Sequence, residues 1–221
     1  MQHHRRYHKK HNKLITDSRL DTIADALVDQ GFIVLTQALD EEVIAGLYAD
    51  VRAMQTAAFT AAGTGRQNLQ QHDLRVRSDK ISWLQANSQA TRSYLDFAGQ
   101  LRHGLNQRLF FGLFDYECHY ARYEPGDFYA KHRDAFAGRS NRILSSVLYL
   151  NRDWPPDAGG ELLLYAEDET TLLYRVKPEY NTLVLFLSER FPHEVLPAQR
   201  QRLSLTGWFR IREDTPLAGK I

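Results

Sequence analysis

The sequence predicts an α+β fold in which a double-stranded β-helix, or jelly roll, is supported by helices from the N-terminal half of the chain. Two observations lead to this prediction. Before residue 110, apolar residues recur at helical spacing in three segments. After Phe110, the chain divides into eight short segments of strand character separated by turn residues. Helices followed by many short strands are typical of an antiparallel β core with helical support.

The chain is expected to form one domain behind a short tail. Residues 1–16 hold four of the nine histidines and five Lys or Arg residues but no acid, which predicts a disordered tail. The domain is assigned to residues 17–221, with helical support over 17–110 and the jelly-roll core over 111–212. The sequence has no apolar run of about 18 residues and no signal-peptide pattern, and it has one cysteine, Cys118. We therefore expect a cytoplasmic protein without membrane contact; the oligomeric state stays open, with a monomer favoured.

Three helices are expected before residue 110, all as scaffold. The first has Asp17 or Ser18 as its N-cap and ends before Gly31, and a short apolar strand follows at 32–35. The second starts at Asp40 and the third at Ser88. The residues predicted to face the core are Leu20, Ile23, Ala24 and Leu27 in the first helix, Val43, Leu47, Val51 and Met54 in the second, and Leu95, Ala98, Leu101, Leu105 and Leu109 in the third.

Between Gly63 and Trp83 the helical periodicity is lost. This segment is long and polar and is opened by glycines. Such segments in compact domains tend to be lids or recognition elements. The sequence therefore predicts a mobile loop or finger here.

The β-rich half is predicted to enclose a polar cavity. Its strands are expected near residues 116–123, 128–134, 142–150, 160–165, 172–176, 182–187, 193–196 and 201–211. The last strand alternates, with Leu203, Leu205, Phe209 and Ile211 on one face and Arg202, Ser204, Thr206, Trp208 and Arg210 on the other. A polar row on a central strand is unfavourable unless it lines a polar cavity. We expect this face to form the inside of the barrel mouth.

The segment from Tyr120 to Asp134 contains a candidate metal site. His132 and Asp134 are separated by one residue, and alternate residues of an extended strand point to the same side. One imidazole and one carboxylate are two of the three ligands of a 2-His-1-carboxylate triad, which binds Fe(II) and leaves positions open for substrate and O₂. By itself the pair is weak support, since such residues usually lie on the wet face of a strand. A second histidine from later in the chain is required.

His193 and Arg202 supply the remaining parts of such a site. A turn after strand 182–187 is expected to bring His193 to a sheet edge, and Arg202 lies on the inward face nine residues later. A guanidinium fixed inside a cavity needs an anion, and its fork matches a carboxylate. A cavity arginine beside an open Fe(II) site is the arrangement that binds 2-oxoglutarate, and Tyr149 or Tyr123 could donate a hydroxyl to the same carboxylate. The alternative for Arg202 is a surface ion pair.

Five motifs occur in order along the chain. They are Arg-Ser-Asp-Lys-Ile-Ser-Trp at 77–83, Tyr-x-x-Gly-x-x-Tyr-x-x-His-x-Asp at 123–134, Tyr-Leu-Asn-Arg-Asp-Trp at 149–154, Gly-Gly-Glu-Leu at 159–162, and His-Glu-Val-Leu-Pro-Ala-x-x-x-Arg at 193–202, which Trp208 follows. Together these motifs resemble the Fe(II)/2-oxoglutarate-dependent prolyl hydroxylases, in particular the branch that holds bacterial prolyl hydroxylases and the animal HIF prolyl hydroxylases. The similarity extends from about residue 20 to 212.

The resemblance assigns roles to individual residues. It implies iron on His132, Asp134 and His193; 2-oxoglutarate on Arg202, Tyr149 and Tyr123; a wall of the metal site at Trp208; and substrate contacts at Arg77, Asp79 and Arg142. The segment with Arg77 and Asp79 would close over the target polypeptide, and we expect a salt bridge between Asp79 and Arg142 at the substrate mouth. The implied cofactors are Fe(II) and O₂, with 2-oxoglutarate as cosubstrate. The implied partner is a protein with an exposed proline, with the translation machinery as one source.

Three functions remain open. The first is hydroxylation of a prolyl residue in a protein, with release of succinate and CO₂. The second is nucleic-acid dealkylation by an oxygenase of the same fold, which is disfavoured because 23 basic residues stand against 27 acidic ones outside the tail. The third is a non-catalytic jelly-roll sensor or binding module, which is disfavoured because three candidate metal ligands and the cavity arginine are all present.

Overall fold

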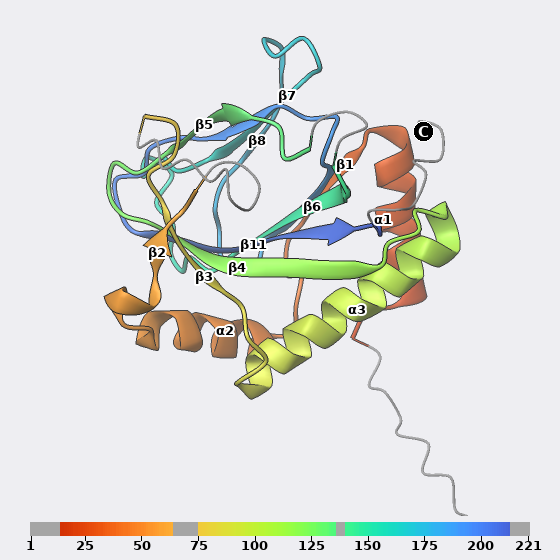
Figure 1. The fold of residues 1–221 in the computed structure, drawn as a ribbon, viewed down its shortest axis with the longest axis horizontal. Coiled ribbons are helices and arrows are strands. Elements are labelled where there is room, and N and C mark those ends of the chain that lie inside the picture. Colours follow the sequence, from red (N-terminus) through yellow and green to blue (C-terminus); the bar gives the residue numbers. More distant parts are fainter. Residues whose placement is uncertain (1–13, 64–74, 136–139, 213–221) are drawn as a thin grey trace, which may run out of the picture.

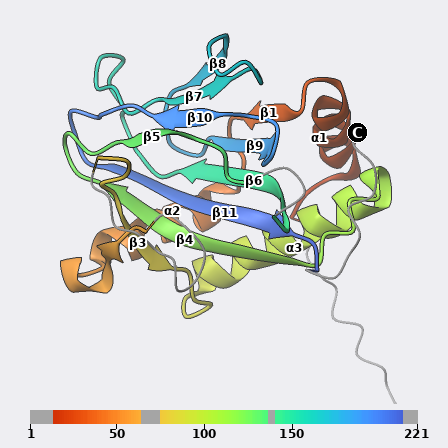
Figure 2. The same ribbon diagram turned by 45° about the horizontal axis from the view of Figure 1, so that its top comes forward.

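Two antiparallel sheets face one another, and helices cover the outer side of the larger sheet (Figures 1 and 2). This arrangement comes from a computed structural model that describes residues 14–63, 75–135 and 140–212. The helices are α1 (Asp17–Asp29), α2 (Glu41–Ala53), the short 3-10 helix η1 (Thr56–Ala58) and α3 (Gln89–Leu109). The strands are β1 (Phe32–Leu35), β2 (Thr60–Ala61), β3 (Lys80–Trp83), β4 (Asp115–Tyr123), β5 (Tyr129–His132), β6 (Arg142–Tyr149), β7 (Leu162–Tyr165), β8 (Leu172–Val176), β9 (Leu183–Leu187), β10 (His193–Val195) and β11 (Arg202–Arg210).

The larger sheet has the strand order β1-β9-β6-β11-β4-β3-β2, and the smaller has the order β5-β10-β7-β8. All eight strands expected after Phe110 are present, and their ends differ from the predicted ends by no more than a few residues. The strand predicted at 32–35 is also present as β1, at one edge of the larger sheet. The predicted jelly roll backed by helices is confirmed.

The three predicted helices are present, but some of their details differ from the prediction. The N-cap of α1 is Thr16, whose hydroxyl accepts from the backbone N–H of Arg19, and neither Asp17 nor Ser18 takes this role. In α2 the buried stripe is Ile44, Leu47 and Val51, so the predicted Val43 and Met54 are only half-buried. In α3 the aromatic residues Tyr94 and Phe97 are buried, whereas Leu95 and Leu109 are half-buried.

Ser88 begins α3 as predicted, and it does so with a reciprocal capping box. Its hydroxyl accepts from the backbone N–H of Thr91, and the Thr91 hydroxyl accepts from the backbone N–H of Ser88. Two of the backbone donors that a helix start leaves unpaired are satisfied in this way. This cap fixes the start of the longest helix under the larger sheet.

The prediction of a continuous loop from Gly63 to Trp83 is wrong at its C-terminal end. Residues 80–83 form β3, which pairs with β4 over four residues and with β2 over two. The strand is half-polar and only four residues long, so its pairing with a distant strand is not visible in the local sequence pattern. Residues 64–74 lie outside the described residues.

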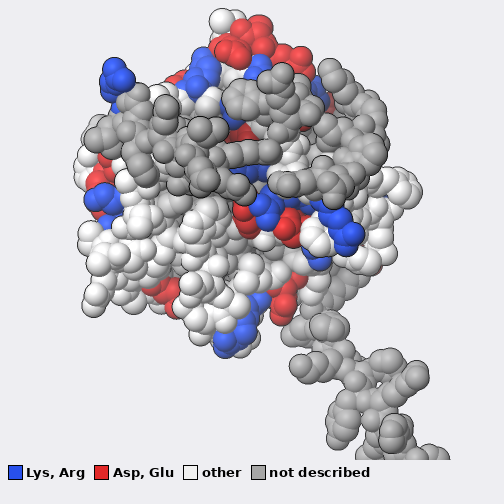
Figure 3. All heavy atoms as spheres, in the orientation of Figure 1, with Lys and Arg blue, Asp and Glu red and all other residues white. Residues whose placement is uncertain are grey.

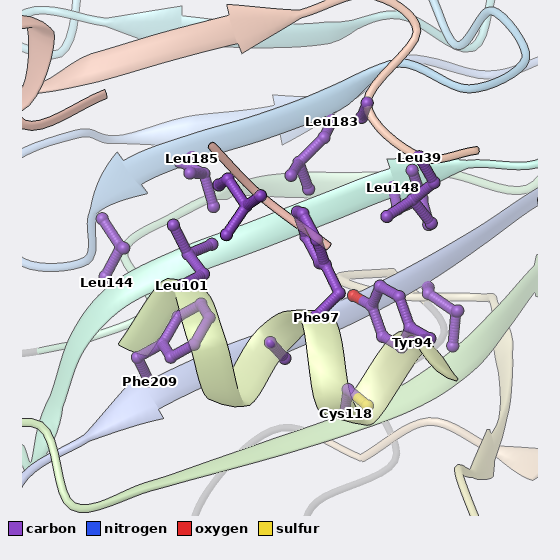
Figure 4. Packing of buried hydrophobic residues seen from close by; sticks show 14 of the residues in the cluster. Leu39, Tyr94, Phe97, Leu101, Cys118, Leu144, Leu148, Leu183, Leu185 and Phe209 are labelled. Carbon is purple, nitrogen blue, oxygen red and sulfur yellow. The ribbon is translucent and has the colours of Figure 1, made fainter. Parts of the chain in front are cut away.

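The core has two parts, one on each side of the larger sheet. The first lies between the helices and this sheet, and Figure 4 shows Tyr94, Phe97 and Leu101 of α3 pointing toward Leu183 and Leu185 of β9. The second lies between the two sheets, and it includes Ala121, Tyr123, Val147 and Tyr149 of the larger sheet and Leu162, Leu164 and Val195 of the smaller one. Alternate residues of β4, β6 and β11 therefore face either the helices or the other sheet.

The packed domain already includes the last residues that were assigned to the tail. Ile15 is buried, and the backbone N–H of Leu14 donates to the side chain of Gln100 on α3. The domain therefore starts before Asp17, while residues 1–13 lie outside the described residues. Within the described part of the chain, no helix is long and apolar enough to cross a bilayer.

Candidate active site

His132, Asp134 and His193 meet between the two sheets. His132 ends β5 and His193 begins β10, and antiparallel pairing of these strands places the two residues directly opposite each other. Their Nε2 atoms lie 3.5 and 3.7 Å from the two carboxylate oxygens of Asp134, and one ligand atom from each residue lies within 4.8 Å of the others. The predicted triad is therefore assembled. β10 lies between β5 and β7, so His193 is inside the sheet rather than at its edge as expected.

Both imidazoles are held in the same way. Nδ1 of His132 lies 2.8 Å from the carbonyl oxygen of Ala130, and Nδ1 of His193 lies 3.0 Å from that of Phe191. An Nδ1–H that donates to these carbonyls leaves Nε2 with a free lone pair, as metal ligation requires. Burial and the neighbouring His132 lower the pKa of His193 to about 4, so its ring is neutral at neutral pH.

Asp134 is fixed by the larger sheet. Its Oδ2 accepts from the hydroxyl of Ser145 on β6 at 2.6 Å, and that hydroxyl lies 2.9 Å from the hydroxyl of Ser188. Burial acts against the charged carboxylate, but His193, His132 and the Ser145 hydroxyl outweigh it and hold the pKa of Asp134 well below its usual range. The result is one hard anionic oxygen opposite two imidazole nitrogens. This donor set fits Fe(II) with open positions.

Arg202 lies in the same interior and is nearly inaccessible to solvent. Its Nε donates to the carbonyl oxygen of Gly160 at 2.9 Å, and its guanidinium lies 4.8 and 5.0 Å from the ring centres of Tyr123 and Tyr149. Within the described residues no carboxylate forms an ion pair with it, so the alternative of a surface ion pair is wrong. The hydroxyl of Tyr149 lies beside it without a well-aligned partner. A buried cation beside a tyrosine hydroxyl fits the distal carboxylate of 2-oxoglutarate.

The predicted salt bridge between Asp79 and Arg142 is not formed. Asp79 is buried and makes a two-bond contact with Arg77, at 2.5 and 2.9 Å. Arg142 instead pairs with Glu117 at 3.1 Å and lies 3.6 Å from the ring centre of Trp208. Arg77 and Asp79 are two residues apart in an extended segment, so they reach each other without any tertiary rearrangement. Asp79 is therefore paired with Arg77, and Arg142 is paired with Glu117.

A stack of side chains links the Arg77–Asp79 pair to the metal site. The Arg77 guanidinium lies 4.5 Å from the ring centre of Tyr129, and the Tyr129 ring stacks on His132 with centres 3.5 Å apart. Tyr129 and Ser145 were not identified as site residues from the sequence. Tyr129 is the second tyrosine of the 123–134 motif, which was a usable signal, whereas nothing in the sequence separates Ser145 from other strand serines.

Comparison with known proteins agrees with the geometry. Residues 118–210 match the family model described as the 2OG-Fe(II) oxygenase superfamily. A prolyl-4-hydroxylase of Pseudomonas putida has a similar structure, with 39% identity and a TM-score of 0.78 over 87% of this chain and 99% of that one. A prolyl hydroxylase from Trichoplax adhaerens, solved with a peptide of the hypoxia-inducible factor oxygen degradation domain, has 25% identity and a TM-score of 0.76 over 92% and 94% of the two chains.

Human Egl nine homolog 1 is 26% identical over 202 residues, which is 86% of this chain and 46% of the human protein. The chain thus spans about half the length of this curated relative, and 25% or less of the next ones. The chain belongs to the 2OG-Fe(II) oxygenases, and within them to the prolyl hydroxylases. The resemblance seen in the five motifs is confirmed.

Proposed function

We propose that the protein is an Fe(II)- and 2-oxoglutarate-dependent dioxygenase that hydroxylates a prolyl residue in a protein substrate, with release of succinate and CO₂. The observation that carries this proposal is the shared interior of the His132, Asp134 and His193 cluster and the buried Arg202, which has no carboxylate partner in the described residues. A metal-binding protein without a cosubstrate would not need a buried guanidinium of this kind. A bound Fe(II), together with O₂ and 2-oxoglutarate, supplies the oxidation of the substrate C–H bond.

The protein's own side chains bind, orient and shield the reactants. His132, Asp134 and His193 would hold the metal on one face, and two imidazoles with one ionised carboxylate suit that role. Arg202 would bind the distal carboxylate of the cosubstrate, with the Tyr149 hydroxyl beside it and the Tyr123 ring beneath the guanidinium. Trp208 would form a wall of the site, held by the Arg142 guanidinium over its ring.

The substrate side of the site is proposed at Arg77, Asp79 and Arg142. The Arg77–Asp79 pair stacks through Tyr129 on His132, and Arg142 is half-exposed beside Trp208. The Trichoplax relative was solved with a peptide, and this supports a polypeptide substrate for the present chain. We propose a monomeric enzyme in the reducing cytoplasm, with an exposed proline in a component of the translation machinery as the first substrate to test.

Nucleic-acid dealkylation receives less support. On the face shown in Figure 3, Lys and Arg side chains lie in small groups among Asp and Glu side chains and do not form a continuous basic surface in the described part. The prolyl hydroxylase relatives also cover nearly the whole of this chain. A protein substrate is therefore the better supported choice.

The test is to treat a proteome from cells lacking the enzyme with the purified protein, Fe(II), 2-oxoglutarate and O₂. A matched sample receives the His132→Ala variant. Mass spectrometry should find proline residues that carry one added oxygen atom only in the first sample, together with succinate formation. Oxygen added to another residue type would reject the prolyl assignment, and loss of methyl groups from added alkylated DNA would favour the dealkylase. Succinate formation in neither sample would reject the oxygenase.

A further inference from the structure

His119 is a buried residue of the active-site interior that none of the assignments above uses. It lies in the middle of β4, opposite Thr206 of β11 and Trp83 of β3. Ala121 and Tyr123, two and four residues further along β4, belong to the core between the two sheets. Because alternate strand residues share a face, the His119 side chain points into the same interior as the metal site.

Among the described residues, neither ring nitrogen of His119 has a hydrogen-bond partner, although the side chain is almost fully buried. Burial, reinforced by Arg77 and Arg142, lowers its pKa to about 3, so the ring is neutral and has one N–H donor and one acceptor. Its neighbours are the rings of Trp83 and Trp208, with centres 5.2 and 5.5 Å away. An apolar side chain would pack equally well between these rings. Packing therefore does not explain why a polar ring stands here.

Two more buried polar atoms on the same face lack a well-aligned hydrogen-bond partner among the described residues. They are the hydroxyl of Tyr149 and Nε1 of Trp208. Tyr149 belongs to the core between the two sheets. Trp208 lies opposite Ser145, whose hydroxyl donates to Asp134, so the Trp208 side chain also points between the sheets. Three side chains on one interior face thus have buried polar atoms without a well-aligned partner. This indicates that a polar ligand completes their hydrogen bonds.

The register of the strands places His119 between the two ends of the site. The row formed by Ser145 and Trp208 holds Asp134 and thus the metal end. The row of Tyr149 and Ser204 lies at the end where the Arg202 guanidinium stands over the Tyr149 ring. His119 and Thr206 form the row between them. A molecule that reaches from the metal ligands to Arg202 along this face of the larger sheet crosses the row that contains His119.

We propose that His119 is an additional cosubstrate-binding residue, which donates its ring N–H to an oxygen of 2-oxoglutarate between the metal and Arg202. This inference rests on the proposed function. 2-Oxoglutarate has only hydrogen-bond acceptors. The N–H of the His119 ring can therefore donate directly to one of its oxygens. The hydrogen bond from His119 thus stabilises the complex with 2-oxoglutarate. In the ligand-free protein the same ring nitrogens lack partners and lower the stability of the fold.

The test compares His119→Met, which keeps a similar volume without ring nitrogens, with His119→Asn, which keeps a donor. The affinity for 2-oxoglutarate is measured on the full chain loaded with Mn(II), by calorimetry, and on the anaerobic Fe(II) protein, by its charge-transfer absorption. We expect His119→Met to bind 2-oxoglutarate roughly tenfold more weakly than wild type, with unchanged Mn(II) affinity, and His119→Asn to recover part of the loss. Cys118→Ala, next in the chain but facing the helices, is the matched control and should bind 2-oxoglutarate as wild type does.

The thermal unfolding temperature of the free protein separates this role from a structural one. His119→Met should unfold at the same or a higher temperature than wild type, because two unsatisfied buried atoms are removed, yet it should gain less from added 2-oxoglutarate. If His119→Met binds 2-oxoglutarate as tightly as wild type, or if it is destabilised and binds no differently from His119→Asn, the inference is wrong. If wild type itself does not bind 2-oxoglutarate, the proposed function fails instead.

Discussion

At the scale of single residues, the defining feature of this site is a buried arginine that has no carboxylate partner among the described residues. Arg202 is buried without a carboxylate in the described residues, while the other charged groups of the interior are paired. Leaving a charge unpaired in such surroundings is unfavourable unless a ligand completes it. Arg202 is thus the residue that should select a dicarboxylic acid as the cosubstrate.

Arg202→Ala should remove most 2-oxoglutarate binding while metal binding remains. A buried cation that pairs with a carboxylate is worth a few kcal/mol, so we expect the affinity for 2-oxoglutarate to fall roughly a hundredfold. Titrations with Mn(II) and then with 2-oxoglutarate measure the two affinities separately. Arg202→Lys is the control for charge alone and should recover only part of the loss, because it lacks the planar fork. Loss of metal and cosubstrate binding together would contradict the assigned role.

His119 should also make the metal-free protein sensitive to acid. Its pKa is about 3 in the folded protein and near 6.5 when unfolded. Below pH 6.5 the unfolded state therefore takes up a proton that the folded state does not, and stability falls as the pH falls toward 3. Between pH 6.5 and 5 the contribution of this one residue is at most about 2 kcal/mol.

The measurement is urea unfolding of wild type and His119→Met at pH 7 and pH 5, with a chelator present. Wild type should lose more stability than the variant between the two pH values, because all other titrating groups are shared. Equal losses in the two proteins would show that the ring of His119 is protonated or accessible in the folded state.

At this scale, a sequence motif predicts which residues form the site. It does not predict which charged residues pair with each other when they are distant in the sequence. His132, Asp134, His193 and Arg202 stand in a recognisable pattern; the structure clusters the first three and buries Arg202 beside Tyr123 and Tyr149 between the sheets. The family resemblance predicts an Asp79–Arg142 pair, because it implies that the segment with Asp79 lies beside Arg142 at the substrate mouth. Glu117 is brought next to Arg142 by the neighbouring strands β4, β11 and β6, and no local pattern reveals that contact.

At the scale of elements, α3 shows how close packing decides the effect of a substitution. The helix has two glycines at interior positions, Gly99 and Gly104. A Cβ at Gly99 would meet nothing within 4 Å, whereas a Cβ at Gly104 would come within 2.5 Å of Leu20 on α1. Helix propensity favours alanine over glycine equally at both sites. The difference between the two sites therefore comes from the contact between α1 and α3.

Gly99→Ala should stabilise the protein by about 0.5 to 1 kcal/mol. Gly104→Ala should destabilise it by roughly 1 kcal/mol or more, because overpacking exceeds the gain in propensity. Thermal and urea unfolding measure both. A stabilised Gly104→Ala would mean that the Leu20 side chain moves aside without loss. Sequence periodicity located this helix and its cap but not Gly104 as a contact, since a small residue on an apolar stripe has no distinctive pattern.

At the scale of the whole molecule, the metal site joins the two sheets. His132 and His193 belong to the smaller sheet, while Asp134 is tied to the larger one through Ser145 of β6. The eight strands after Phe110 could be predicted from turns and alternation, but their division between two sheets could not, because pairing is between strands distant in the sequence. The site depends on that division, since only the two sheets together bring the carboxylate between the two histidines.

Ser145→Ala should therefore weaken metal binding without removing a ligand. The hydroxyl of Ser145 orients the Asp134 carboxylate and stabilises its charge, and loss of such a contact lowers metal affinity by about 10- to 100-fold. Titration with Mn(II), followed by calorimetry, measures the affinity, and the rise in unfolding temperature on adding Mn(II) should shrink in parallel.

Ser146→Ala is the matched control: its hydroxyl faces the helices and contacts Tyr116 and the carbonyl of Gly207. This variant should lose stability but keep the metal affinity of wild type. Equal metal affinity in Ser145→Ala and wild type would mean that the sheets hold Asp134 in place without this contact.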